Sequence, residues 1–284
     1  MEFLPLRATA EKVESQRRSN PRGYRRWSLG SLLPALLLLL LFTYCLIDLK
    51  ISPQLFIEGI PHFFNLVSEM LPPNWEVFWR GKILWSILET LSMAFVGTFW
   101  GALGAFFLGL LGAANVSPSP IVREVAKRLL ALERTIPPLI YILLLVVVIG
   151  LGPFAGMLVI ALGTIGMLGK LFAEAIEVID PKPLESIESG GATRLQVIRY
   201  AVLPQVLPSL IANTLYRFDI NLRVALFLGV VGGGGIGVDL QMAMSLFRYA
   251  DALAITLVTL LLIWMAERIS DYLRRRVIGQ EVLQ

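Results

Sequence analysis

Residues 83–112 read ILWSILETLSMAFVGTFWGALGAFFLGLLG, and this run decides the fold class. An α-helix rises about 1.5 Å per residue, so about 20 apolar residues cross the roughly 30 Å hydrocarbon core of a bilayer. The run exceeds that length. In lipid, every backbone polar group must bond within the segment or its closed sheet. The stretch therefore predicts a transmembrane helix in an all-α integral membrane protein.

Further apolar segments indicate a chain with about six transmembrane helices. The other predicted spans cover residues 30–49, 136–152, 154–179, 204–230 and 250–270. The composition agrees, because 56% hydrophobic and 16% charged residues are too apolar for a soluble protein. Between the third and fourth spans, the sequence Gly150-Leu151-Gly152-Pro153 cannot continue a helix. We therefore expect these two spans to form a hairpin.

The organisation of the chain follows from these spans. Residues 1–29 are predicted to form a polar cytoplasmic tail, and residues 30–82 a first transmembrane helix with an external, aromatic-rich interfacial segment. Residues 83–276 are predicted to form the main transmembrane domain, and residues 277–284 a C-terminal tail. The basic start followed by an apolar run is also typical of a secretory signal, but the run is too long for a signal core. We expect an uncleaved helix.

Lysine and arginine predict the orientation, because positive charge is retained on the cytoplasmic side. With both termini inside, the inner segments 1–30, 113–135, 170–204 and 268–284 hold 19 of the 25 basic residues. The outer segments 50–82 and 231–250 hold 4. Both termini are therefore predicted to be cytoplasmic.

Several functions are made improbable by the residue inventory. Cys45 is the one cysteine and His62 the one histidine, so neither a disulfide nor an imidazole metal cluster is expected. The net charge of +4 is spread over short stretches between spans, which favours membrane orientation over nucleic-acid binding. We expect no catalytic residue, metal or cofactor in this chain.

The most informative polar stretch lies between the predicted fourth and fifth spans, at about residues 183–204. Pro183, followed by two acidic residues, predicts a helix start, and Gly190-Gly191 predicts its end. A second short helix is expected from Arg194 to Ala201, ending where Leu203-Pro204 opens the next span. The simpler alternative is a loop that merely joins two spans.

This stretch resembles the coupling loop of binding-protein-dependent importer permeases. The family pattern is Glu-Ala-Ala, three residues, Gly, nine residues, Ile, one residue, Leu-Pro. Glu185, Gly191 and Leu203-Pro204 match it at the right spacing. Ser186, Ile187 and Ala201 depart from it, conservatively in size. The resemblance implies contact with an ATPase by Glu185, Glu188, Gly190, Gly191, Ala192, Arg194, Leu203 and Pro204.

Other segments resemble the phosphonate importer permease in particular. They are residues 150–156, 169–174, 179–181, 199–208, 215–218 and 231–237. The resemblance implies a type I ABC importer permease fold in the bacterial cytoplasmic (inner) membrane. It also implies a homodimer, two cytoplasmic ATPase subunits that bind ATP and Mg, and an external solute-binding protein. The implied cargo is phosphonate or a related phosphorus oxyanion (phosphite, hypophosphite or phosphate).

The fifth apolar segment is too polar to face lipid on all sides, and charge at mid-membrane often marks a pathway. We expect a substrate path lined by Asn213, Tyr216, Arg217, Asn221 and Arg223. Arg217 has no acid three or four residues away, so its partner must come from another helix, another protomer or the substrate. Guanidinium suits a tetrahedral oxyanion. For Arg223 the alternative is a local ion pair with Asp219.

A glycine run follows on the predicted outer side. Gly232, Gly233, Gly234, Gly235 and Gly237 are expected to form an external gate or a docking surface, with backbone N–H groups that could meet an anion. The alternative is a flexible turn between two spans.

The ATPase of such an importer must be another chain. A phosphate-cradling loop needs Gly, four residues, Gly-Lys and then Ser or Thr. The stretch from Gly163 to Gly169-Lys170 fails in spacing and in the following Leu171.

Two other classes of protein remain as alternatives. An ion-coupled secondary transporter of small anions would explain intramembrane charge but not the 183–204 stretch. A membrane enzyme would need an acid–base or nucleophile constellation, which is not evident.

Overall fold

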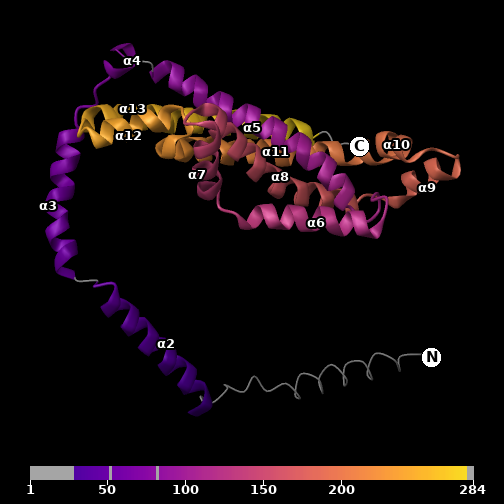
Figure 1. Ribbon diagram of the computed structural model, residues 1–284, viewed down its shortest axis with the longest axis horizontal. Helices are drawn as coiled ribbons and strands as arrows, with labels where there is room; N and C mark the ends of the chain where they lie inside the picture. The colour runs from indigo at the N-terminus through magenta and orange to yellow at the C-terminus, as the bar shows by residue number, and fades with distance from the viewer. Residues whose placement is uncertain (1–28, 51–52, 81–82, 280–284) are drawn as a thin grey trace, which may run out of the picture. The chain divides into compact units, whose positions relative to one another are not determined.

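The computed structural model describes residues 29–50, 53–80 and 83–279, and every regular element in these ranges is a helix (Figure 1). Most of the predicted tails, 1–29 and 277–284, lies outside the described residues. The helices are α2 (Leu29–Asp48), α3 (Pro53–Met70), α4 (Val77–Arg80), α5 (Ile83–Gly112), α6 (Pro120–Thr135), α7 (Pro138–Ile149), α8 (Pro153–Glu177), α9 (Pro181–Ser189), α10 (Arg194–Val197), α11 (Leu203–Leu228), α12 (Ile236–Ser245) and α13 (Tyr249–Gly279).

The chain divides into two compact units, residues 1–64 and 65–284. In the first unit, α2 is the apolar helix predicted over 30–49. Helix α3 begins in this unit, where the interfacial helix is predicted, and its Phe56 and Phe63 are exposed. The external location of this segment stays a prediction.

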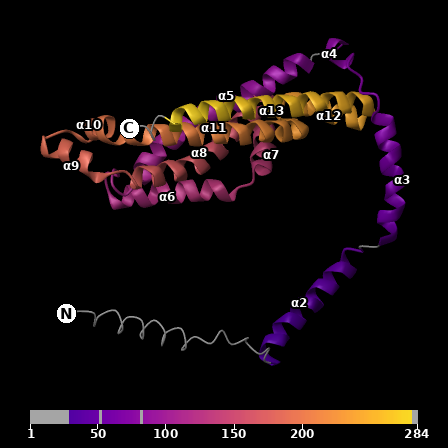
Figure 2. The ribbon, with the colours of Figure 1, turned by 180° about the vertical axis from the view of Figure 1, so that it is seen from behind.

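Four helices of the second unit are long and apolar enough to cross a membrane. They cover Ile83–Gly112, Pro153–Glu177, Arg194–Gly233 and Tyr249–Val277. These helices match the spans predicted over 83–112, 154–179, 204–230 and 250–270. Figures 1 and 2 show α5, α8, α11 and α13 running alongside one another as a bundle.

The third predicted span differs from the prediction. Helix α7 has 12 residues, which at about 1.5 Å each is too short to cross the bilayer alone. It forms a bent pair with α6, and the two helices meet at an angle of 88°. The residues of α6 belong to the segment 113–135, which was predicted as an inner loop. Pro137-Pro138 causes the bend, because the residue before a proline is disfavoured in the α conformation. The described residues thus hold four spans, or five if this pair is one.

Helices α5 and α8 approach closely along a seam of small residues. A Cβ atom on Gly97 would lie 2.7 Å from Ile160 Cγ2, and one on Gly101 would lie 2.7 Å from the Ala161 carbonyl oxygen. Small residues allow such backbone contact between membrane helices. The seam therefore fixes the distance between these two spans.

We expect Gly101→Ala to destabilise the protein, because its methyl group would overlap Thr164 and the Ala161 carbonyl oxygen. Overpacking of this kind costs about 1–3 kcal/mol of unfolding free energy. Thermal unfolding in detergent checks it, with Gly112→Ala on the same helix as the control. A Cβ on Gly112 meets its nearest neighbour at an ordinary 3.6 Å. Equal stability of the two variants would contradict a tight seam.

The bundle gathers predicted inner segments at one end. Beyond α5, the Ala114 N–H donates to Glu177 Oε1 at 2.9 Å and Asn115 Nδ2 donates to the Ile176 carbonyl at 2.6 Å. Helices α9 and α10 lie at this same end, while α4 and α12 lie at the opposite end (Figures 1 and 2). There Asn74 Nδ2 donates to Asp251 Oδ1 at 2.7 Å. Which of these two ends faces the cytoplasm stays a prediction.

Candidate functional site

The predicted coupling stretch begins with α9, which starts two residues earlier than expected, at Pro181 rather than Pro183. The Asp180 carboxylate caps it, accepting from the Lys182 N–H at 3.0 Å. The Asp180 N–H in turn donates to Gln205 Oε1 at 3.1 Å, and Gln205 Nε2 donates to the Ala201 carbonyl at 2.8 Å. Asp180 makes the better cap because its carboxylate satisfies a free N–H of the first turn. Gln205, which the sequence did not single out, ties α9 to α11.

A tight turn separates α9 from α10. Gly190 ends α9, and Gly191 has φ +80°, in the left-handed region that favours glycine. Thr193 then caps α10 in a capping box, in which its N–H donates to Gln196 Oε1 at 2.7 Å. The predicted helix–glycine–helix order is thus present, with Thr193 and Gln196 as additional supports.

The second helix does not end before Leu203-Pro204 as expected. Helix α10 continues through a π-helical turn, Ile198–Val202, into α11, giving one helical span of 40 residues, Arg194–Gly233. The Leu203 N–H bonds to the Ile198 carbonyl across this turn. Pro204 lacks a backbone N–H, and the π-helical turn directly before it allows the helix to continue past this residue. The second helix is therefore continuous with a membrane span.

The α9–α10 element, defined as residues 181–197, is anchored on one side and open on the other. Leu184 and Val197 are buried in a cluster with Leu168 and Phe172 of α8. The opposite side is exposed, and Leu195 on α10 keeps 78% of its surface accessible. Leu195 is therefore accessible at this end of the bundle. The exposed members include Glu185, Glu188, Gly191, Arg194 and Leu195.

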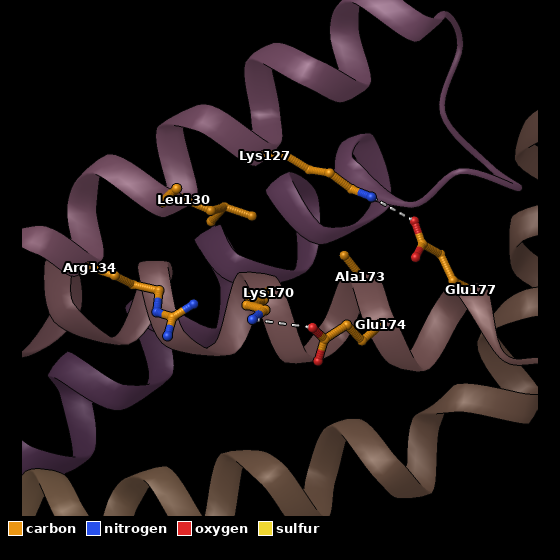
Figure 3. A pocket seen from close by; sticks show the side chains of 8 residues that line it. Lys127, Leu130, Arg134, Lys170, Ala173, Glu174 and Glu177 are labelled. Atoms are coloured by element: carbon orange, nitrogen blue, oxygen red, sulfur yellow. Dashed lines mark hydrogen bonds and ion pairs between the residues drawn. The ribbon is translucent and has the colours of Figure 1, made fainter. Parts of the chain in front are cut away.

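A charged groove runs between α6 and α8 (Figure 3). It has a volume of about 290 Å³ and is lined by Lys127, Leu130, Ala131, Arg134, Lys170, Ala173, Glu174 and Glu177. We call it the α6–α8 groove. Lys127 Nζ lies 3.0 Å from Glu177 Oε1, and Lys170 Nζ lies 3.5 Å from Glu174 Oε1. These side chains could not be singled out from the sequence, in which the charges of residues 120–135 are indistinguishable from those of an inner loop.

The Arg217 side chain lies close to residues of α6 and α8. Its Nη1 donates to Met167 Sδ at 2.9 Å, and its Nη2 lies 3.3 Å from the position of a Cβ on Gly163. Glu133 of α6 is the nearby acid, with its Oε1 3.9 Å from the same Cβ position. The expectation that Arg217 takes a partner from another helix is thus met in part, by a neighbouring charge in place of a direct ion pair.

Asn221 is placed differently from the prediction. Its side chain is fully buried, and Nδ2 donates to Thr98 Oγ1 and to Thr164 Oγ1, both at 2.8 Å. It therefore joins α5, α8 and α11 inside the bundle, and this geometry does not support a place in the path. Asn213, two stripe positions before Asn221, is half-buried, with Nδ2 3.4 Å from Ser209 Oγ.

The adjoining stripe of α11 faces α13 instead of forming a local ion pair. Arg223 Nη2 bonds to Glu267 Oε2 at 3.0 Å, and Asp219 Oδ2 lies 3.4 Å from Arg274 Nη2. The Arg274 guanidinium also lies 5.8 Å from the centre of the Tyr216 ring. The alternative of an Asp219–Arg223 pair is therefore wrong, because α13 supplies a partner to each. Tyr216 and Arg223 belong to the seam between α11 and α13.

The glycine run packs closely against other parts of the bundle. Gly235 N–H donates to Glu89 Oε2 at 3.2 Å, and Ile236 N–H donates to Thr90 Oγ1 at 2.9 Å. The Gly232 carbonyl accepts from the Gly152 N–H at 3.0 Å. Because these N–H groups have partners within the chain, the run offers no free anion site at them. A role as an external gate or docking surface stays a prediction for Gly232, Gly233, Gly234, Gly235 and Gly237.

Within the described ranges, no group of three or more histidine, cysteine, aspartate or glutamate side chains is arranged to hold a metal ion. The arrangement offers an end surface for a partner and a charged groove between helices.

Comparison with known proteins places these features in context. The family described as "Binding-protein-dependent transport system inner membrane component" matches residues 105–279. The phosphite transport system permease protein PtxC of Stutzerimonas stutzeri is 36% identical, over 77% of this chain and 79% of that protein. The phosphate-import permease protein PhnE of Mycolicibacterium smegmatis is 40% identical, over 78% of this chain and 42% of that protein.

Solved structures share the fold. A chain of the MetNI methionine ABC transporter in an inward-facing conformation aligns with a TM-score of 0.62 at 21% identity, covering 72% of this chain and 99% of that chain. A chain of a bacterial ABC transporter involved in the import of alginate aligns with a TM-score of 0.61 at 19% identity, covering 90% of this chain and 99% of that chain.

Proposed function

Because the chain belongs to the family of binding-protein-dependent transport system inner membrane components, we propose that it is the membrane-spanning permease of an ATP-driven importer of phosphorus oxyanions. Relatives named as phosphite and phosphate permeases, at 36% and 40% identity, support this substrate class. Phosphonate and hypophosphite are also small phosphorus oxyanions. An ion-coupled secondary transporter, the alternative, has no support from the family.

The observation that carries the proposal is the α9–α10 element. It is anchored in the bundle by Leu184 and Val197, so a force on its exposed side is transmitted to α8 and α11. Such elements bias a bundle between two packed states. We assign ATPase contact to the exposed side, together with the exposed apolar Leu195. The proposed coupling set is Glu185, Glu188, Gly190, Gly191, Ala192, Arg194, Leu203 and Pro204.

The proposed path for the anion follows the α6–α8 groove toward Arg217. Basic side chains of Lys127, Arg134 and Lys170 line the groove. Arginine near the middle of α11 adds a donor suited to paired hydrogen bonds with an oxyanion. The chain needs no covalent chemistry for this task, since transport requires alternating access only.

The complex we propose contains two copies of this chain, two cytoplasmic ATPase subunits that bind ATP and Mg, and an external solute-binding protein. It lies in the bacterial inner membrane, with both termini cytoplasmic. The excess of basic residues in segments predicted as inner supports this orientation. A solved relative of the fold is described as a complex with a substrate-bound periplasmic protein, which supports the external partner.

Reconstitution tests the function. Proteoliposomes carrying this chain, its ATPase and its binding protein should accumulate phosphite, phosphonate or phosphate only when ATP reaches the ATPase. The uptake of each labelled anion is measured with ATP, with ADP and without the binding protein. Accumulation that does not require ATP would support the secondary transporter, and failure with every phosphorus oxyanion would overturn the substrate class. Size-exclusion chromatography with light scattering distinguishes two copies from a pair with a related permease.

A further inference from the structure

Glu133 and Arg217 face each other across α8. A Cβ on Gly163 would lie 3.3 Å from Arg217 Nη2 and 3.9 Å from Glu133 Oε1. A Cβ on Gly166 would overlap Glu133 Oε2. These two glycines form a notch, which we call the Gly163–Gly166 notch, near the middle of α8. The notch brings together opposite charges from α6 and α11.

Both groups are poorly satisfied in this arrangement. Glu133 Oε2 and Arg217 Nε are buried without a hydrogen-bond partner. Within the part of the chain that the structure describes, neither side chain forms a direct ion pair, and the Met167 sulfur that accepts from Arg217 is a weak acceptor. Burying unsatisfied charged groups is costly, so such a site calls for an explanation beyond stability. A tetrahedral oxyanion at the notch would supply acceptors to the guanidinium.

In the α6–α8 groove next to the notch, cationic side chains also lie close to carboxylates. Lys127 has Glu177 beside it and Lys170 has Glu174, so each of these cations carries its own carboxylate. Arg134 follows Glu133 directly, and Lys170 lies about one turn beyond Gly166 on α8. A passing anion thus meets cations whose attraction is reduced by nearby acids. Transport requires binding that is favourable enough for entry and weak enough for release.

We propose that Glu133 is the resident counter-charge of Arg217 in the anion path. The Glu133 carboxylate offsets the positive charge of the guanidinium when the path is empty. During passage, the oxyanion replaces this carboxylate as the negative group beside Arg217. This inference rests on the proposed function, and it adds a residue on α6 that limits how long an anion is held. Removing the carboxylate leaves an uncompensated arginine that retains anions.

The test uses the assembled permease–ATPase complex and radiolabelled inorganic phosphate and phosphite. Glu133→Gln keeps the shape and removes the charge, so release of bound label should slow about tenfold. Glu124→Gln is the matched control, since Glu124 lies on the same helix but is exposed and pairs with Arg128. Glu133→Asp, which keeps a carboxylate, should release label close to the wild-type rate.

A double variant adds a sharper readout. In Arg217→Ala the remaining Glu133 carboxylate repels anions, so ATP-driven uptake should be lower than in Arg217→Ala/Glu133→Gln, by about fivefold or more. Uptake is compared per folded permease in the membrane, because a merely structural charge pair would give rescue only through stability and the amount of folded protein. Equal uptake in the two variants, or equal release in Glu133→Gln and Glu124→Gln, would overturn the counter-charge. Absence of phosphorus oxyanion uptake in the wild type would instead overturn the proposed function.

Discussion

Leu195→Asp should abolish ATP-driven uptake while leaving the permease folded. The side chain is 78% exposed at the end of the bundle, so the substitution has little reason to disturb the fold. In the proposed complex, the same side chain is buried against the ATPase, and an unpaired carboxylate there is costly. A loss of roughly 2 kcal/mol or more in binding corresponds to about a 30-fold weaker Kd. Co-purification with the ATPase and uptake in proteoliposomes measure the two effects.

Leu195→Met is the control, because it keeps an apolar side chain of similar volume and should retain both ATPase binding and uptake. The anchoring residues Leu184 and Val197 are left untouched in both variants. If Leu195→Asp binds the ATPase as the wild type does, the exposed side of α10 is not part of the contact. The proposed coupling surface would then have to move to another part of the bundle end.

Arg217→Ala should lower uptake by about 10- to 100-fold with ATPase binding unchanged. A hydrogen bond to a charged group contributes about 1.5–3 kcal/mol, and the substitution removes the paired donors offered to the oxyanion. Arg217 is far from the α9–α10 element along α11, so assembly with the ATPase should persist. Initial uptake rates at saturating binding protein, together with ATPase co-purification, separate these two outcomes.

Arg223→Gln provides the matched control on the same helix. It removes the same charge, but Arg223 is half-exposed and pairs with Glu267 of α13. Exposed ion pairs contribute about 0–1 kcal/mol, so uptake should fall little. Equal losses in the two variants would mean that total charge on α11, rather than a specific guanidinium, governs transport.

Local patterns in the sequence predicted much of the architecture. Apolar runs such as 83–112 and 154–179 exceed the length that a bilayer requires, and they are helices in the structure. The spacing of Glu185, Gly191 and Leu203-Pro204 predicted the family, and the match over residues 105–279 confirms it. Gly191 takes the left-handed conformation that its position between two helices requires. The information for these features lies within a few turns of chain.

Other features could not be predicted from local patterns. Residues 120–135, predicted as part of an inner loop, form helix α6, which meets α7 at 88° and lines one side of the α6–α8 groove. Pro137-Pro138 lies at the bend, within the span predicted over 136–152, but only packing against Gly166 and Gly169 of α8 determines where α6 lies. A charged helix and a charged loop have similar compositions, so the sequence left the two indistinguishable.

The sequence by itself determined the membrane fold and the helix–glycine–helix order of residues 181–197, because hydrophobic length and helix-breaking glycines act locally. Only the tertiary structure decided the partners of the polar residues on α11. Asn221 bonds to Thr98 and Thr164, and Arg217 faces Glu133, although all of them are distant in sequence. Helical periodicity assigns residues to a face, whereas the partner of that face depends on which helices pack against it.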